Sequence, residues 1–213
     1  ARQKEFLGPD DPVAACEEFI RLAHEFKVGN YRERHAFSEY EEGLRRRFRP
    51  VGPPPDACRG LPADDWIDLQ DNQFRLAHPG QWAAIVDDPK ASDGQAARMP
   101  GDHHEWATSC PLSDDLGYGN PWRCFVVARA EATGTEGVAM TMGIYDTENR
   151  KGLANRSVSA AEVSGGEYQI FDLGVHDLNG QIYVWVAPTA RPDEVQAVFV
   201  DRVYLIREKE KSQ

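Results

Sequence analysis

The stretch AVFVDRVYLI, residues 197–206, is a run of small, branched and aromatic residues that contains one carboxylate, Asp201. Successive side chains of a strand point to opposite faces, so residues 197, 199, 201, 203 and 205 are expected on one face and the others on the opposite face. Apolar side chains on both faces predict a strand with neighbours on both sides. A carboxylate in such a strand must be hydrogen-bonded, ion-paired or metal-bound, because burying it alone is costly.

The rest of the chain after Trp66 predicts the partners of this strand. Apolar residues recur there with a period of two, and turn clusters such as HPG, GTEG and DLNG separate the runs. The runs predict strands near 66–70, 73–77, 82–87, 95–99, 103–109, 123–132, 137–146, 167–174, 181–187 and 196–206. Many short strands without a helical pattern predict a mainly β fold, an antiparallel β-sandwich of the jelly-roll type.

The N-terminal part has a different pattern. Residues 11–28 predict a helix that Asp11 caps, and residues 38–48 predict a second one with a capping box of Ser38 and Glu41. The apolar stripe of the first helix consists of Val13, Cys16, Phe19, Ile20, Ala23 and Phe26. Two short amphipathic helices cannot bury their stripes against each other alone, so they must dock on the sandwich or on a larger body.

The segment RPVGPPPDACRGLPADD is rich in proline and predicts a stiff connection. The expected organisation is therefore a helical segment at 1–49, serving as docking helices or as the tail of a missing catalytic domain. A linker at 50–65, a sandwich at 66–207 and a disordered tail at 208–213 follow it. The N-terminus has no apolar signal-peptide core, which predicts a mature or excised fragment.

Charge is divided unevenly along the chain. Residues 1–50 carry 10 basic and 10 acidic residues, whereas residues 51–213 carry 14 and 25, which accounts for the net charge of −11. Nucleic-acid binding depends mainly on neutralising phosphates, so an acidic domain argues against a nucleic-acid partner. No stretch of eighteen apolar residues occurs, so no membrane span is expected.

The four cysteines have no metal-binding spacing. Cys110 with Cys124, and Cys16 with Cys58, are possible disulfide pairs, and four unpaired thiols are the alternative. The cysteines therefore leave the cellular compartment open.

Three segments of the chain resemble carbohydrate-binding modules of the jelly-roll (galactose-binding-like) class. QWAAIVDDPKASDGQAARM at 81–99 is similar to their early strands, EYQIFDLGV and GQIYVWVAP within 167–188 to their penultimate pair, and AVFVDRVYLI to their last strand. The arrangement as a whole resembles the C-terminal region of bacterial glycoside hydrolases related to α-glucuronidases. The resemblance implies a secreted or periplasmic, polysaccharide- or oligosaccharide-binding module with a parent catalytic domain in cis.

The resemblance also implies a structural calcium ion held by the last-strand aspartate. Asp201 would bind it with acids of the early strands and turns, namely Asp68, Asp88 and Asp93, or with Asp65 and Gln70. Calcium takes six to eight oxygen ligands, so clustered acids suit it. The alternative is that Asp201 pairs with Arg202, with Arg75 or with a backbone amide.

A sugar-binding site needs an exposed aromatic ring beside polar side chains. Trp185 is the best candidate platform, because Ile182, Val184 and Val186 of its strand face the core. The further candidates are Tyr145, Trp122, Tyr118, Tyr183, Arg129, His103 and Glu105, with Arg98 as a second possible partner for a uronic acid. Trp66, Trp82 and Trp106 are assigned to packing, since tryptophan is highly buried on average.

Three functions compete at this stage. The first is a non-catalytic module that targets a polysaccharide-degrading enzyme to its glycan, and the second is a sandwich that packs on its catalytic domain without binding sugar. The third is a β-sandwich polysaccharide lyase, in which His103, Tyr145, Arg150 and Gln181 would be catalytic. No familiar catalytic motif supports the third.

Overall fold

The computed structural model describes residues 12–32, 35–37, 40, 41, 44, 52–112 and 121–208. The chain divides into two compact units, Ala1–Val51 and Gly52–Gln213. The division falls near the start of the proline-rich segment, most of which belongs to the second unit.

The first unit contains helix α2 (Pro12–Glu25) and a short hairpin of β1 (Asn30–Arg32) and β2 (His35–Ala36). Cys16, Ile20 and Ala23 of the predicted apolar stripe are buried, whereas Phe19 and Phe26 are exposed. The second predicted helix, 38–48, falls mostly outside the described residues. None of the helices in the described part of the chain has both the length and the apolar character that a membrane span requires.

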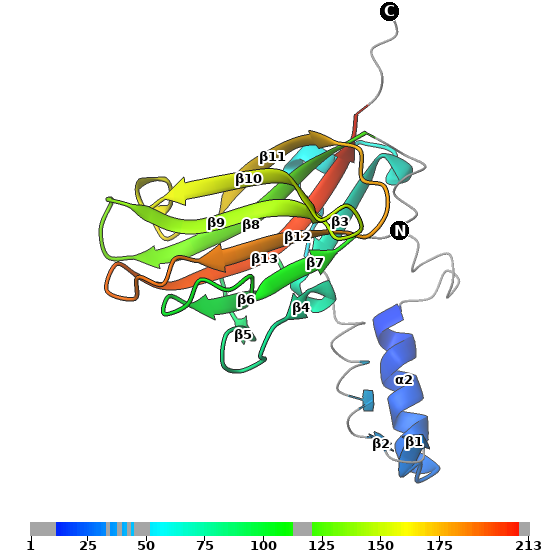
Figure 1. Cartoon of the computed structure of the whole chain (residues 1–213). Coiled ribbons are helices and arrows are strands. Elements are labelled where there is room, and N and C mark those ends of the chain that lie inside the picture. The colour runs from blue at the N-terminus through cyan, green and yellow to red at the C-terminus, as the bar shows by residue number, and fades with distance from the viewer. Residues whose placement is uncertain are drawn as a thin grey trace, which may run out of the picture. The chain divides into compact units, whose positions relative to one another are not determined.

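The second unit is a sandwich of two antiparallel sheets, as the sequence predicts (Figure 1). A five-stranded sheet has the order β10-β9-β12-β7-β4, and a six-stranded sheet has the order β11-β8-β13-β6-β5, with β3 also paired to β13. The strands are β3 (Trp66–Gln70), β4 (Arg75–Leu76), β5 (Ala84–Asp87), β6 (Gln95–Pro100), β7 (Thr108–Pro111), β8 (Trp122–Ala132), β9 (Val138–Asp146), β10 (Lys151–Ser159), β11 (Gln169–His176), β12 (Ile182–Pro188) and β13 (Val195–Arg207).

Strand β13 lies inside its sheet, which confirms the prediction from its apolar faces. It pairs with β8 along its whole length on one side, and with β6 and then β3 on the other. The predicted alternation holds only as far as Val200. The register on β8 shifts between Val200 and Arg202, so Asp201 is the extra residue of a β-bulge. Val198 and Val200 therefore share the core with Val203 and Leu205.

The bulge places two consecutive charged residues outside the hydrophobic core, where both remain buried. Arg202 Nε donates to Asp201 Oδ2 over 3.3 Å, and its Nη1 donates to Asp68 Oδ2 of β3 over 3.0 Å. The same Nη1 donates to the carbonyl of Pro53 over 2.9 Å. Arg202 thus holds the proline-rich segment, β3 and β13 together. Two of the alternatives for Asp201 are therefore observed: it pairs with Arg202 and accepts from a backbone amide, that of Ser92.

Loops cover part of the outer face of the six-stranded sheet. Phe199 and Ala197 pack there with Ala91 and Ala96 in a second, smaller apolar cluster. Lys90 Nζ donates to the carbonyl of Gly166 over 3.0 Å and so links the loop after β5 to the loop before β11. This face is closed around Phe199, which matters for where a ligand can bind.

Two details differ from the sequence prediction. The region 103–109 becomes a strand only from Thr108, and β10 was not predicted at all. β10 is an edge strand with polar residues on both faces, so it lacks the apolar alternation that identifies a half-buried strand.

All four cysteines are buried and free, so neither suggested disulfide forms.

We expect Arg202→Met to destabilise the sandwich by about 3–5 kcal/mol, because it leaves the buried carboxylates of Asp68 and Asp201 without their cation. Burial raises the pKa of both carboxyl groups. Such groups favour folding in their protonated form, so the variant should regain stability as the pH falls from about 7 toward about 4. Urea unfolding at several pH values measures both effects.

The matched control is Arg123→Met, which removes the exposed ion pair of Arg123 with Asp172. Exposed pairs contribute little, so its midpoint should change far less. Equal losses in the two variants would contradict the role assigned to Arg202.

Candidate functional site: an aromatic hollow on the open sheet

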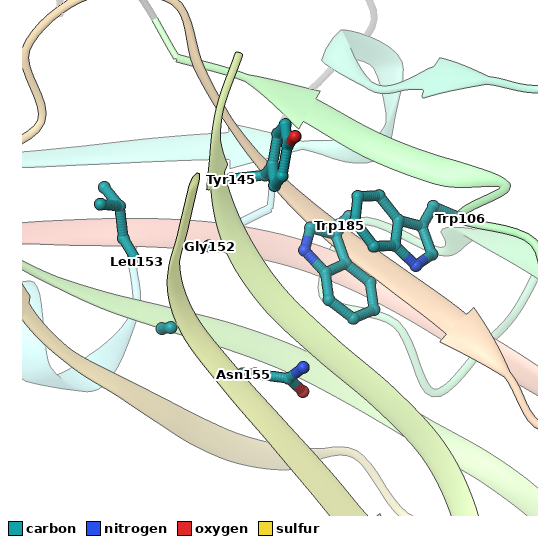
Figure 2. Close-up of a pocket in the computed structure, with 7 residues that line it drawn as sticks. Trp106, Tyr145, Gly152, Leu153, Asn155 and Trp185 are labelled. Atoms are coloured by element: carbon teal, nitrogen blue, oxygen red, sulfur yellow. The ribbon is translucent and has the colours of Figure 1, made fainter. Parts of the chain in front are cut away.

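The outer face of the five-stranded sheet carries a hollow of about 440 Å³. Figure 2 shows Trp106 and Trp185 stacked on one side of it, Tyr145 at its end, and strand β10 with Asn155 on the other side. The lining residues are Trp106, Tyr145, Gly152, Leu153, Ala154, Asn155 and Trp185. The volume lies within the range of about 300–1,000 Å³ that is typical of small-molecule sites.

The two indoles form a parallel pair. Their ring centroids lie 4.2 Å apart with an interplanar angle of 9°. Trp185 is only 5% exposed, whereas Trp106 is 42% exposed, so Trp106 is the ring of the pair that solvent reaches most. Tryptophan side chains are on average much more buried than this one. The exposed indole of Trp106 therefore marks a candidate binding surface.

Two tyrosines extend the aromatic surface. The ring centroid of Tyr145 lies 5.6 Å from that of Trp106 and 5.6 Å from that of Tyr183, and Tyr183 lies 6.3 Å from Trp106. Tyr183 and Tyr145 are direct cross-strand partners on β12 and β9. Burial raises the pKa of Tyr183, with a smaller contribution from Tyr145, so its hydroxyl stays neutral.

The strand register explains why the indoles fit. Gly143 of β9 lies directly opposite Trp185 on one side and Asn155 on the other. A Cβ atom at Gly143 would lie 2.9 Å from the indole of Trp185 and 2.4 Å from the carbonyl of Ala154. Glycine is therefore needed for the indole to lie across β9.

A β-bulge in β10 shapes the opposite side of the hollow. The register on β9 shifts between Gly152 and Ala154, which leaves Leu153 as the additional residue. Four consecutive residues of an edge strand consequently line one site, including the exposed amide of Asn155. Bulges are frequent next to functional sites because they redirect side chains.

The loop that carries Trp106 is anchored by His103. The His103 Nε2 atom lies 2.9 Å from the carbonyl oxygen of Trp82, and the amide of Glu105 donates to His103 Nδ1 over 3.2 Å. Nε2 must then carry the proton and donate to Trp82. The amide of Ala107 donates to the carbonyl of Glu105 over 2.7 Å, which closes a tight turn around Trp106. The indole is thus held in place before any ligand binds.

The structure brings together some of the predicted site residues and not others. Trp185, Tyr145 and Tyr183 gather at the hollow, and Glu105 is exposed beside Trp106. Trp122 does not offer its ring to a ligand, because it is 2% exposed in the core of the sandwich. Tyr118 lies outside the described residues.

Two other predicted ligand-binding side chains have structural roles. Arg129 Nε donates to Asp88 Oδ2 over 2.9 Å, and the Arg129 guanidinium lies over the ring of Phe199. Tyr168 also donates to Asp88 Oδ2, over 2.7 Å. His103 is buried and uses both ring nitrogens within the protein. Neither Arg129 nor His103 lines the hollow.

Sequence reasoning missed Trp106 and Asn155. The assignment of Trp106 to packing followed from the average burial of tryptophan, whereas the turn at 105–107 holds this one at the surface. Asn155 was missed because its strand was not predicted. The signal that existed was the composition of GDHHEW, which combines an aromatic with polar residues.

Several oxygens of the acids expected to hold calcium already have partners within the protein. Asp201 Oδ1 accepts hydrogen bonds from the Ser92 amide and hydroxyl over 3.1 and 2.8 Å, and its Oδ2 faces Arg202. Asp201 Oδ2, Asp68 Oδ2 and the carbonyl oxygen of Pro53 thus converge on the Arg202 guanidinium. Among the described residues, no three His, Cys, Asp or Glu side chains are grouped as a metal would require.

Asp88 and Asp93 are also engaged within the protein. Burial acts to raise the pKa of Asp88, but hydrogen bonds from Tyr168 and Arg129 outweigh it and hold the pKa below its ordinary value. Asp93 Oδ1 accepts from the amide of Gln95 over 3.1 Å, in the turn before β6.

No protein-family model matches the chain. A search of curated proteins likewise gave no match.

Three similar solved structures contain carbohydrate-binding modules. One is the CBM22-1–GH10 portion of endo-1,4-β-D-xylanase 10B from Clostridium thermocellum, complexed with xylohexaose. It is 14% identical with a TM-score of 0.43, and the match covers 70% of this chain and 28% of that one. The CBM36-1 domain of a xylanase from the hindgut metagenome of Trinervitermes trinervoides is 10% identical (TM-score 0.45; 68% and 98% covered). A family 35 module from Clostridium thermocellum is 14% identical (TM-score 0.42; 66% and 98% covered). None of these three is an α-glucuronidase, so the link to that group of enzymes finds no support in them.

Since Arg202 already compensates the carboxylates of Asp68 and Asp201, we expect a chelator to leave the stability of the sandwich unchanged. The melting temperature should be the same in excess EDTA and in excess calcium chloride. A substantial fall in EDTA, reversed by calcium, would contradict this account of Asp201 and would restore the calcium hypothesis.

Gly143→Ala should separate the stacked indoles, because the new methyl group would overlap the ring of Trp185. The exciton couplet of the Trp106–Trp185 pair in the far-ultraviolet circular dichroism spectrum reports this directly. Gly134→Ala is the control, since a Cβ atom there meets nothing within 4 Å. An unchanged couplet in Gly143→Ala would disprove the packing described here.

Proposed function

We propose that the sandwich is a non-catalytic carbohydrate-binding module whose glycan site is the aromatic hollow at Trp106, Trp185 and Tyr145. The single observation that carries the proposal is the exposed indole of Trp106, which stacks on the buried indole of Trp185. Sugar rings present C–H faces that pack on aromatic planes, so a fixed and accessible indole is a suitable platform.

The polar groups around the indoles suit the hydroxyl groups of a sugar. Asn155 offers both an amide donor and a carbonyl acceptor, and Tyr145 offers a hydroxyl. These groups come from β9 and β10, while the indoles come from β12 and the 101–107 loop. A ligand in the hollow would therefore contact several elements at once, as specific sites do.

The lining gives no support to catalysis. Glycoside hydrolysis uses two carboxyl groups across a cleft, and none of the described residues that line the hollow is acidic. The lyase alternative cast His103 as a base, but both of its ring nitrogens are occupied by Trp82 and Glu105. Binding is the function that these residues can perform.

We further propose that the module serves a polysaccharide-degrading enzyme, in a secreted or periplasmic protein. The support is the resemblance of residues 81–99, 167–188 and 197–206 to such modules, together with the separate N-terminal unit. Docking on a catalytic domain without sugar binding is the rival function, and the following experiment separates the two.

Trp106→Ala should abolish binding to any glycan that the wild-type protein binds on an array. We expect a loss of about 2 kcal/mol or more in isothermal titration, because a central aromatic contact is typically dominant. Trp106→Phe should keep part of the affinity, since it retains an aromatic plane. Thermal melting should be little changed, because the indole is 42% exposed.

Ile170→Ala is the matched control. Ile170 is 59% exposed on β11 of the other sheet, so its removal takes away a surface apolar group without touching the hollow. It should leave affinity unchanged. Binding that survives in Trp106→Ala would place the glycan elsewhere, and binding of no glycan by the wild-type protein would favour the docking function.

A further inference from the structure

The lining of the hollow carries no formal charge. Its seven residues are aromatic, aliphatic or, in Asn155, an amide. The chain as a whole, by contrast, has 35 acidic and 24 basic residues and a net charge of −11. The residues around a binding site reflect the charge of the ligand, because a buried charge without a partner is costly.

The arginines that might have served an acidic sugar are engaged elsewhere. Arg129 is 7% exposed in its ion pair with Asp88, on the other sheet. Arg98 lies on β6 of that same sheet, with its guanidinium 5.9 Å from the ring centroid of Phe199. Arg156 of β10 donates to Glu162 and to the carbonyl of Asp172.

Two further basic residues, Lys151 and Arg75, belong to the same sheet as the hollow. Lys151 precedes Gly152, but its strand partner is Asp146, whose pKa it helps to lower. Arg75 is exposed on β4, two strands away from Trp185 and therefore roughly 10 Å across the sheet. Neither residue lines the hollow.

We infer that the hollow selects neutral glycans and discriminates against uronic-acid and sulfated ones, an inference that rests on the proposed carbohydrate-binding function. A neutral sugar needs only stacking on Trp106 and hydrogen bonds to groups such as Asn155. A carboxylate or sulfate group would lose hydration there without gaining the charged hydrogen bonds that an arginine or lysine provides. It would also approach a protein of strongly negative net charge.

Isothermal titration of the whole chain tests this inference with glycans of both kinds. The neutral probes are hexasaccharides of β-1,4-linked xylose, mannose and glucose, and the acidic probes are oligogalacturonate, oligoalginate and a sulfated galactan oligosaccharide. At least one neutral probe should bind at least about tenfold more tightly than every acidic probe. Its affinity should change less than about twofold between roughly 50 mM and 500 mM NaCl, because neutral contacts are not screened by salt.

Asn155→Arg provides a gain-of-function test. An arginine there gives the hollow a partner for an anion, so the variant should gain affinity for the acidic probes, and that affinity should fall with salt. Ile170→Arg is the matched control, because it adds the same charge on the other sheet. Equal gains in the two variants would mean that net charge alone excludes acidic glycans and would overturn the inference.

The outcomes for the inference and for the proposed function are distinguishable. Tight, salt-sensitive binding of an acidic probe that is lost in Trp106→Ala would overturn the neutral selectivity and leave the sugar site standing. Binding of any probe that survives in Trp106→Ala would overturn both, and so would a failure of all probes of both kinds to bind.

Discussion

The sandwich depends on the contacts of the Arg202 guanidinium with the buried carboxylates of Asp68 and Asp201 and with one backbone carbonyl. It exists because a single extra residue, Asp201, bulges from β13 and lets consecutive charged residues leave the core together. At the same point β13 exchanges β6 for β3 as its neighbour. A cation is needed there to compensate Asp68 and Asp201, and the chain provides it from its own strand. One sheet is thereby fixed, and the other packs on it.

The two outer faces of the sandwich differ in how far loops and side chains cover them. On the six-stranded sheet, Phe199 is covered by Arg129 and by the loops that Lys90 joins. On the five-stranded sheet, the aromatic residues of β9 and β12 meet Trp106 at the surface. The face that is closed carries the charged network, and the open face carries the uncharged hollow. The charged network and the uncharged hollow thus lie on different sheets of one acidic protein.

Sequence reasoning predicted the parts of this picture that depend on local pattern. The period of two in β12 was enough to place Tyr183 and Trp185 outward, and the apolar faces of β13 were enough to place it inside a sheet. The bulge at Asp201 was not predictable, because a register shift depends on the neighbouring strands. Trp106 and β10 were missed for related reasons: a loop turn sets the first, and the second is a polar edge strand with no periodic signal.

The most direct test of the central claim is a nuclear magnetic resonance titration that follows the indole N–H signals of all five tryptophans. With a neutral oligosaccharide that binds, the account predicts shifts at Trp106 and Trp185, while the signals of Trp82 and the buried Trp122 stay nearly unchanged. Shifts confined to tryptophans away from the hollow, with Trp106 and Trp185 unaffected, would contradict it.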